Sequence, residues 1–300
     1  MNAKQWVFLF VLAALWGGSF LFIRVGVPAL GPVVLMWLRV GIASAALGVF
    51  AALSRRRPAV AGKWKSYLLL GLLNAALPFS LIAAAELHIS SSLAAILNAT
   101  TPLFTALVAR VWTGDPLTPR KAGGLVLGIL GVAVLVGWEP YHSDGQLLVS
   151  AAMSLLAACS YAVAGVYTSR AFKGEHPVDM AIGQQLAATV ILLPFACAAL
   201  PRAAWPPVAI AAVVALAVLC TALAYLFFFA LIRDVGPVRA LSVTLLVPVF
   251  GTAWGALFLG EPLSWNVIAG LALVLCSVAL VARAPAAPVG RPGAAASPAR

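Results

Sequence analysis

Gly-Asp-Pro-Leu at residues 114–117 returns, 146 residues later, as Gly-Glu-Pro-Leu at residues 260–263. The same ungapped offset relates Gly124 to Gly270 and Val132 to Val278. Both copies lie in long apolar stretches, so the chain reads as a duplicated membrane unit. Many secondary transporters place their substrate site where two such repeats meet. The duplication therefore predicts a transporter rather than a membrane anchor.

The composition excludes water as the main solvent of this chain. Of its 300 residues 63% are hydrophobic and only 9% are charged, whereas soluble domains are about a quarter charged. The net charge of +11 gathers partly in the basic segment 55–65, which we interpret as a cytoplasmic loop and not as a nucleic-acid site. The four cysteines and three histidines have no metal-ligand or disulfide spacing, so we expect neither a metal nor a cofactor.

The apolar runs predict an all-α integral membrane protein, because about 20 apolar residues are needed to cross the hydrocarbon core. Ten runs between polar or Pro/Gly breaks qualify. They lie at residues 6–23, 32–53, 66–86, 91–111, 121–138, 147–168, 179–200, 208–232, 237–259 and 264–282. The first run has no small-residue cleavage pattern after it, so we read it as a helix and not as a signal peptide.

The basic residues predict the orientation of these spans. With the N-terminus inside, 16 of the 19 lysines and arginines fall in cytoplasmic segments, as the positive-inside rule requires. Both termini are then cytoplasmic. Each repeat contains an odd number of spans, five, so the second repeat starts on the opposite side of the membrane from the first. The repeat at 147–282 is therefore expected to be inverted relative to the repeat at 1–138. The Ala/Pro/Gly/Arg-rich segment 283–300 is expected to be a disordered cytoplasmic tail.

The motifs together resemble a known family. Leu-Trp-Gly-Gly-Ser-Phe at 15–20, the run from Ser92 to Leu117 and the run from Ala240 to Leu263 are similar to the signatures of the drug/metabolite transporter (DMT) superfamily, in its ten-helix EamA-type branch. Asp115 departs from the glutamate that is commoner in the family. The resemblance covers residues 6–282 and implies a carrier of small metabolites in a bacterial-type inner membrane, often an amino-acid exporter.

Arg39 is the first candidate for substrate binding. It lies about 10 Å into the second span at 1.5 Å per residue, where a charge costs a few kcal/mol unless it faces the bundle interior and finds a partner. One interpretation makes Arg39 the anchor of a substrate carboxylate. The other is structural, with Arg39 bonded to freed backbone carbonyls or paired with Glu86.

Three prolines predict bends that line a cavity or act in gating. Pro102 and Pro248 hold matching positions, and Pro78 repeats the pattern in the third span. Each proline deprives the carbonyl four residues earlier of its donor. For Pro102 that carbonyl belongs to Asn98, whose side chain we expect to face the cavity. The alternative is a packing kink that is satisfied locally.

Amide and aromatic side chains complete the predicted substrate site. Gln184 and Gln185 are adjacent in the seventh span, so one faces the cavity and the other bonds a neighbouring helix, and the sequence does not distinguish them. Four rings are assigned to the cavity wall, with belt or core packing as the alternative. They are Trp16, Phe79, Tyr161 and Tyr225.

Other motifs favour structural roles. Asp115-Pro116 and Glu261-Pro262 each put an acid near the start of a helix, where it complements the helix dipole. The Gly-xxx-Gly pairs at 124–128 and 251–255 are expected to pack helices within one chain, and the protein is expected to be monomeric.

Elimination narrows the function. All eight acids lie in loops or at span ends, so no carboxylate is expected at the midplane to bind a cationic drug or to relay protons. The substrate is therefore expected to be a neutral, zwitterionic or singly anionic small molecule, moved across the lipid bilayer by alternating access. No hydrolase, protease or Walker motif occurs, so the chain is not expected to be an enzyme or an ATPase. The alternative function is a channel-like facilitator or lipid scramblase.

Overall fold

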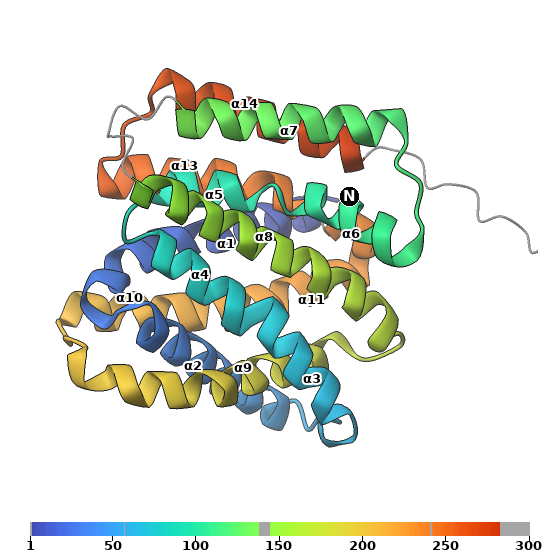
Figure 1. The fold of residues 1–300 in the computed structure, drawn as a ribbon. Helices are drawn as coiled ribbons and strands as arrows, with labels where there is room; N and C mark the ends of the chain where they lie inside the picture. Colours follow the sequence, from blue (N-terminus) through green and yellow to red (C-terminus); the bar gives the residue numbers. More distant parts are fainter. Residues whose placement is uncertain (1, 57, 138–144, 241, 283–300) are drawn as a thin grey trace, which may run out of the picture.

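The computed structural model describes residues 2–56, 58–137, 145–240 and 242–282, and this part of the chain is helical without strands (Figure 1). Its α-helices are α1 (Ala3–Leu30), α2 (Pro32–Leu53), α3 (Trp64–Gly71), α4 (Leu77–Ala85), α5 (Ser91–Asn98), α6 (Thr101–Thr113), α7 (Pro119–Gly137), α8 (Gly145–Ala171), α9 (Pro177–Ala199), α10 (Pro207–Ala217), α11 (Ala224–Val235), α12 (Pro237–Ala240), α13 (Val243–Leu259) and α14 (Trp265–Ala282). Leu72–Ala76 and Val218–Leu223 are π-helical, and Ala61–Lys63 and Leu200–Arg202 are short 3-10 turns.

These helices confirm the all-α membrane architecture. Within the described residues, nine helical stretches are long and apolar enough to cross a membrane, and the 17-residue helix α13 is apolar but shorter. Large apolar side chains also point outward, such as Val111 at 89% and Leu53 at 81% exposure. Such a surface is stable only against lipid. The inverted orientation of the second repeat and the side of the termini stay predictions, and the tail at 283–300 lies outside the described residues.

The two halves of the chain are packed into one bundle. Helices α7 and α14 lie side by side along one edge, and α1 packs on α13, α2 on α9, and α4 on α8 (Figure 1). Every one of these pairs joins a helix from before residue 140 to one from after it. The largest buried cluster accordingly contains residues of both halves, from Phe20 to Val281. The halves therefore share a core, and any site at its centre is built by both.

The repeated Gly-acid-Pro-Leu motif ends a helix in each half. Gly114 closes α6 with φ of +77°, and Gly260 closes α13 with φ of +67°. Both values lie in the left-handed region that residues with a Cβ rarely adopt, so glycine is the natural residue for the helix C-terminus. The proline two residues later then prevents the helix from continuing.

The span predicted at 91–111 is interrupted and not merely bent. Helix α5 ends at Asn98, and Pro102 stands in the first turn of α6, where a proline needs no backbone donor. The Thr101 hydroxyl donates to the Asn98 carbonyl at 2.7 Å, so the freed carbonyl is satisfied locally. The kink predicted at Pro102 is thus replaced by a helix break. Pro248, its counterpart, lies inside the continuous helix α13.

Glycines bring helices of the two halves into close contact within the chain. A Cβ on Gly17 of α1 would lie 2.7 Å from the backbone nitrogen of Gly251 in α13, and a Cβ on Gly251 would lie 2.6 Å from the Cβ of Ala95. Gly124 of α7 similarly approaches Val281 of α14. The expected packing of the Gly-xxx-Gly pairs within one chain is confirmed.

The contact between α1 and α13 predicts a contrast between two glycines. Gly17→Ala should lower stability by about 1–3 kcal/mol, because the new methyl group meets backbone that cannot rotate away. Gly48→Ala, where an added Cβ meets nothing within 4 Å, is the matched control and should not destabilise the helix. Thermal unfolding of the purified variants in detergent measures both. Equal midpoints would contradict the close packing of α1 on α13.

Candidate functional site

Two π-helical segments flank the centre of the bundle at corresponding positions. Leu72–Ala76 lies between α3 and α4, and Val218–Leu223 lies between α10 and α11, with starts 146 residues apart. In each, an N–H reaches five residues back, from Leu77 to Leu72 and from Ala224 to Leu219. π-Helical turns are rare and occur frequently at functional sites. This shared irregularity marks the place where the site residues gather.

Pro78 accounts for the first π-helical segment. In a π-helix the residue five positions before a proline loses its donor, and for Pro78 that residue is Leu73. The Ser160 hydroxyl of α8 donates to the Leu73 carbonyl at 2.7 Å and supplies the missing bond. Pro78 therefore stays buried inside one nearly continuous helical stretch, as a locally satisfied irregularity. The second segment has Ala224 at the matching position, so no proline in the sequence signals it.

Arg39 projects from α2 into this region and is only 5% exposed. Its Nε–H donates to the Thr221 hydroxyl, 3.0 Å away in the second π-helical segment, and its guanidinium carbon lies 3.7 Å from the centre of the Phe79 ring. Thr221 donates in turn to the Leu216 carbonyl at 2.9 Å, which fixes the hydroxyl. Thr221 thus holds the Nε edge of the guanidinium, and the Phe79 ring covers one of its faces.

The outer nitrogens of Arg39 have no partner among the described residues. No carboxylate oxygen of that part of the chain lies within 4.0 Å of the guanidinium, and only the Nε–H bond to Thr221 is formed. The contacts of the structural alternative, a pair with Glu86 or bonds to backbone carbonyls, are therefore not formed by Arg39 within the described residues. An arginine fork fixed at Nε leaves two parallel N–H groups, the pattern that binds a carboxylate in bidentate fashion.

A line of amides and a phenol runs beside Arg39. Asn74, in the first π-helical segment, donates to the Gln184 side-chain oxygen at 2.8 Å, and Gln184 donates to the Tyr225 hydroxyl at 2.5 Å. Tyr225 also interacts electrostatically with Arg39. Gln184 therefore joins Asn74 of the first half to Tyr225 of the second half. Gln185 is fully buried elsewhere, with both amide atoms unpartnered among the described residues.

Aromatic rings from both halves complete the cluster. Tyr161 of α8 interacts electrostatically with Arg39, and its ring meets Phe79 edge-on at 6.3 Å between centroids. Phe79 and Tyr225 hold matching positions in the two repeats and both lie in this cluster. The central cluster, defined by Arg39, Asn74, Phe79, Tyr161, Gln184, Thr221 and Tyr225, combines one cation with amides, hydroxyls and rings.

Besides Gln185, two of the predicted substrate-binding residues are not tied to the central cluster by any contact in the described structure. Trp16 packs its ring on Phe228 at 5.2 Å, as core packing would require. Asn98 ends α5, and its side-chain oxygen is buried without a partner among the described residues. Thr221 was not predicted from the sequence, and Asn74, the residue four positions before Pro78, was not assigned to the substrate site. Neither stands out until the π-helical turns bring Asn74 to Gln184 and Thr221 to Arg39.

Glu261 caps a helix other than the one it was expected to serve. Its two carboxylate oxygens accept the backbone N–H groups of Ser91 and Ser92, at 2.7 and 2.9 Å, in the first turn of α5. The carboxylate thus complements the positive end of α5 and joins the second half of the chain to the first. Asp115, the counterpart of Glu261, is exposed and accepts no hydrogen bond from a described residue.

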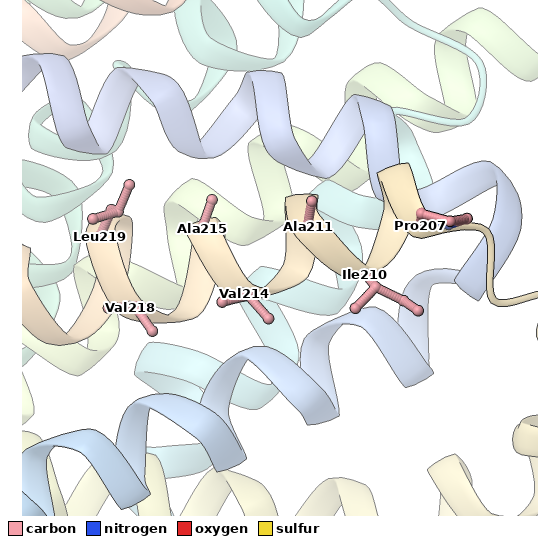
Figure 2. Close-up of a pocket in the computed structure, with 7 residues that line it drawn as sticks. All are labelled: Pro207, Ile210, Ala211, Val214, Ala215, Val218 and Leu219. Carbon is pink, nitrogen blue, oxygen red and sulfur yellow. The ribbon is translucent and has the colours of Figure 1, made fainter.

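A hollow of about 630 Å³ lies along α10, which packs between α1 and α2. Figure 2 shows the side chains that line it. Its lining runs from Pro207 to Leu219 and is entirely apolar. Ile210 and Val214 are more than 40% exposed there, so this surface faces lipid. No group in the hollow can orient a polar metabolite, and the central cluster remains the candidate site.

The described residues also bring no three His, Cys, Asp or Glu side chains together as metal ligands.

Comparisons with known proteins agree over nearly the whole chain. The model of the EamA-like transporter family matches residues 4–137 and 148–283. The uncharacterized inner membrane transporter YedA of Escherichia coli is 30% identical over 281 residues, 91% of this chain and 89% of YedA. A "probable terminal-alkyne amino-acid exporter" of Streptantibioticus cattleyicolor is 28% identical and covers 94% and 95%. A crystal structure with 21% identity, covering 93% of this chain and 96% of its own, has the same fold with a TM-score of 0.63.

The hydrogen bond at Pro78 predicts a coupling between two residues. Ser160→Ala should destabilise the protein by about 1–3 kcal/mol, because it leaves the Leu73 carbonyl unpaired. In a Pro78→Ala background the restored N–H serves that region, so the same change should cost less. Ser154→Ala removes an unpartnered buried hydroxyl from the same helix and is the matched control. Additive costs for Ser160 and Pro78 in a double-mutant cycle would refute the coupling.

Proposed function

This chain belongs to the EamA-like transporter family, and we propose that it is a secondary carrier that exports an amino acid or a closely related carboxylate by alternating access. It is an integral protein of the inner membrane and a transporter, not an enzyme. The observation that carries the proposal for the substrate is the buried, oriented and unpaired guanidinium of Arg39.

Energetics favour a functional role for Arg39. A buried cation without a counter-ion is unfavourable, and hydrophobic replacement of such groups is often neutral or stabilising. The contacts with Thr221 and Phe79 orient the guanidinium but do not neutralise it. A substrate carboxylate would neutralise it, which makes binding of an anionic group the favourable way to complete the site.

The rest of the central cluster suits the remainder of an amino acid. Phe79 and Tyr161 offer ring surfaces to an apolar side chain. The Tyr225 hydroxyl, which already accepts from Gln184, and the Asn74 side-chain oxygen are available to a substrate amino group. The exporter of S. cattleyicolor, whose printed name refers to an amino acid, is similar along almost the whole chain and supports the same substrate class.

The internal symmetry supports alternating access. The offset of 146 residues relates the two Gly-acid-Pro-Leu motifs and the starts of the two π-helical segments. With the basic residues on the cytoplasmic side, the two five-span repeats are inverted relative to one another. In such transporters the halves rock about a site at their interface, and residues of both halves build the central cluster.

The two acidic motif residues support a state that is closed at one end. Glu261 is bonded to the start of α5, whereas its counterpart Asp115 is exposed. In the proposed topology the Glu261 end is the outer one, and its bond to α5 supports an outer side that is closed. Rocking to the opposite state would break the Glu261 cap and bring the Asp115 end together.

The alternative function is a channel-like facilitator or lipid scramblase. Thr221 and Phe79 hold the charge of Arg39 within the bundle. This arrangement favours a saturable binding site for one ligand over an open pore. Counterflow in proteoliposomes separates these functions, because only a carrier exchanges labelled internal substrate for unlabelled external substrate. A panel of amino acids and small organic acids identifies the substrate in the same assay.

Arg39→Gln should raise the KM for a transported amino acid about 10- to 100-fold, because it removes a charge-assisted carboxylate bond. Transport of the corresponding carboxamide, which has no carboxylate, should change little. Counterflow of both compounds in proteoliposomes is the measurement. Arg233→Gln, at a side chain that is 79% exposed, is the control.

The thermal stability of the same variants separates binding from folding. Arg39→Gln should unfold at the same temperature as the parent protein or higher, because it removes an unpaired buried charge. Loss of folded protein in step with loss of transport would instead make Arg39 a structural residue.

A further inference from the structure

Glu86 is a buried acid for which the substrate site has no use. It follows the last residue of α4, its side chain is fully buried, and neither carboxylate oxygen has a partner among the described residues. Buried carboxylates are normally paired or hydrogen-bonded, so an orphan of this kind needs an explanation. Asp179, also buried, differs because it stands in the first turn of α9, where the helix dipole stabilises its charge.

The groups that face Glu86 come from three other elements. Arg24 of α1 donates to the Glu86 backbone carbonyl and not to its carboxylate. Arg39 of α2 and Glu261, which precedes α14, act on Glu86 through their charges. Neither arginine comes within 4.0 Å of the carboxylate in the described structure. The carboxyl group therefore has cations nearby but no ion pair.

These surroundings favour the neutral acid. Burial, reinforced by the negative charge of Glu261, raises the pKa of the Glu86 carboxyl well above its usual range. The positive charges of Arg24 and Arg39 oppose this effect without cancelling it. In the conformation described, the neutral form of Glu86 is therefore favoured over a buried carboxylate, which would be costly.

We propose that Glu86 is the proton-binding site of this carrier and that its protonation couples substrate movement to the proton gradient across the membrane. The proposal rests on the carrier function proposed above. The ligand is a single proton, taken from water onto a Glu86 oxygen on one side of the membrane and returned to water on the other. The proton site is distinct from the central cluster but close enough to Arg39 for their charges to interact.

The neighbouring Glu261 cap links this proton to the movement of the protein. A neutral Glu86 lets the negative Glu261 remain on the first turn of α5. An ionised Glu86 would repel Glu261, weaken the cap and draw Arg39 toward a carboxylate of the protein itself. The closed end is thus stable with the proton bound, and loss of the proton favours its opening. Substrate carboxylate and ionised Glu86 would then compete for the same guanidinium charge.

Infrared spectroscopy of the purified protein tests the proton site without any substrate. A protonated carboxyl group shows a C=O stretching band that a carboxylate lacks. At neutral pH the difference spectrum between the parent protein and Glu86→Gln should contain this band. Glu175→Gln, at a partly exposed acid paired with Lys63 at 2.7 Å, should leave it unchanged. Absence of the band from the first difference spectrum overturns the proposal.

Proton movement during transport tests the coupling. Proteoliposomes are loaded with a labelled mixture of the standard amino acids and the pH indicator pyranine, so that efflux and internal pH are read together. In the parent protein and in Glu175→Gln, efflux should be accompanied by a change in internal pH. In Glu86→Gln, efflux of substrate should continue, and the internal pH should change no more than it does in protein-free liposomes.

The outcomes separate the two proposals. A pH change that persists in Glu86→Gln, or efflux from the parent protein without any pH change, overturns proton coupling through Glu86. Absence of amino-acid efflux from the parent protein contradicts the proposed substrate class instead, and the infrared band then decides whether Glu86 holds a proton. Because glutamine imitates the neutral acid in size and charge, Glu86→Gln should also fold, and its failure to do so would contradict a neutral Glu86.

Discussion

An uncompensated positive charge inside an apolar bundle is the constraint on which the arrangement of the centre depends. Arg39 is almost fully buried, and the residues that the structure describes provide it with a ring face and one hydroxyl but no carboxylate. Continuous α-helices do not readily offer the polar atoms needed beside such a charge, since their backbone groups are bonded internally. The π-helical segments around Asn74 and Thr221 bring polar side chains to the centre while keeping most backbone bonds.

The sequence predicted those parts of the structure that follow from local pattern. Apolar run length gave the spans, and Arg39, Phe79 and Tyr225, which the sequence analysis assigned to one substrate site, lie in one cluster of the structure. The π-helical turns were missed because their cause is partly tertiary. Ser160 on a distant helix supplies the bond that lets Pro78 remain, and the second turn contains no proline at all.

Contacts between residues that are far apart in the sequence are the second kind of feature that the sequence did not predict. Glu261 was expected to stabilise the helix that follows it, and helix-dipole reasoning applies equally to any helix whose start it can reach. Only the packing of α13 on α5 places Ser91 and Ser92 under its carboxylate. Asn98 was expected in the cavity because of Pro102, but the helix break and the Thr101 hydroxyl already satisfy the backbone there. The sequence pattern is the same whether a polar side chain near a proline faces the substrate cavity or the backbone is satisfied locally.

The central claim is that the guanidinium of Arg39 is held ready for a substrate carboxylate. An experimental structure of the protein with a transported amino acid bound tests it most directly. The account predicts that the carboxylate lies within hydrogen-bond distance of the two outer nitrogens of Arg39, with Thr221 still bonded to Nε. A substrate bound away from Arg39, with the guanidinium paired to an acidic residue of the protein, would contradict it.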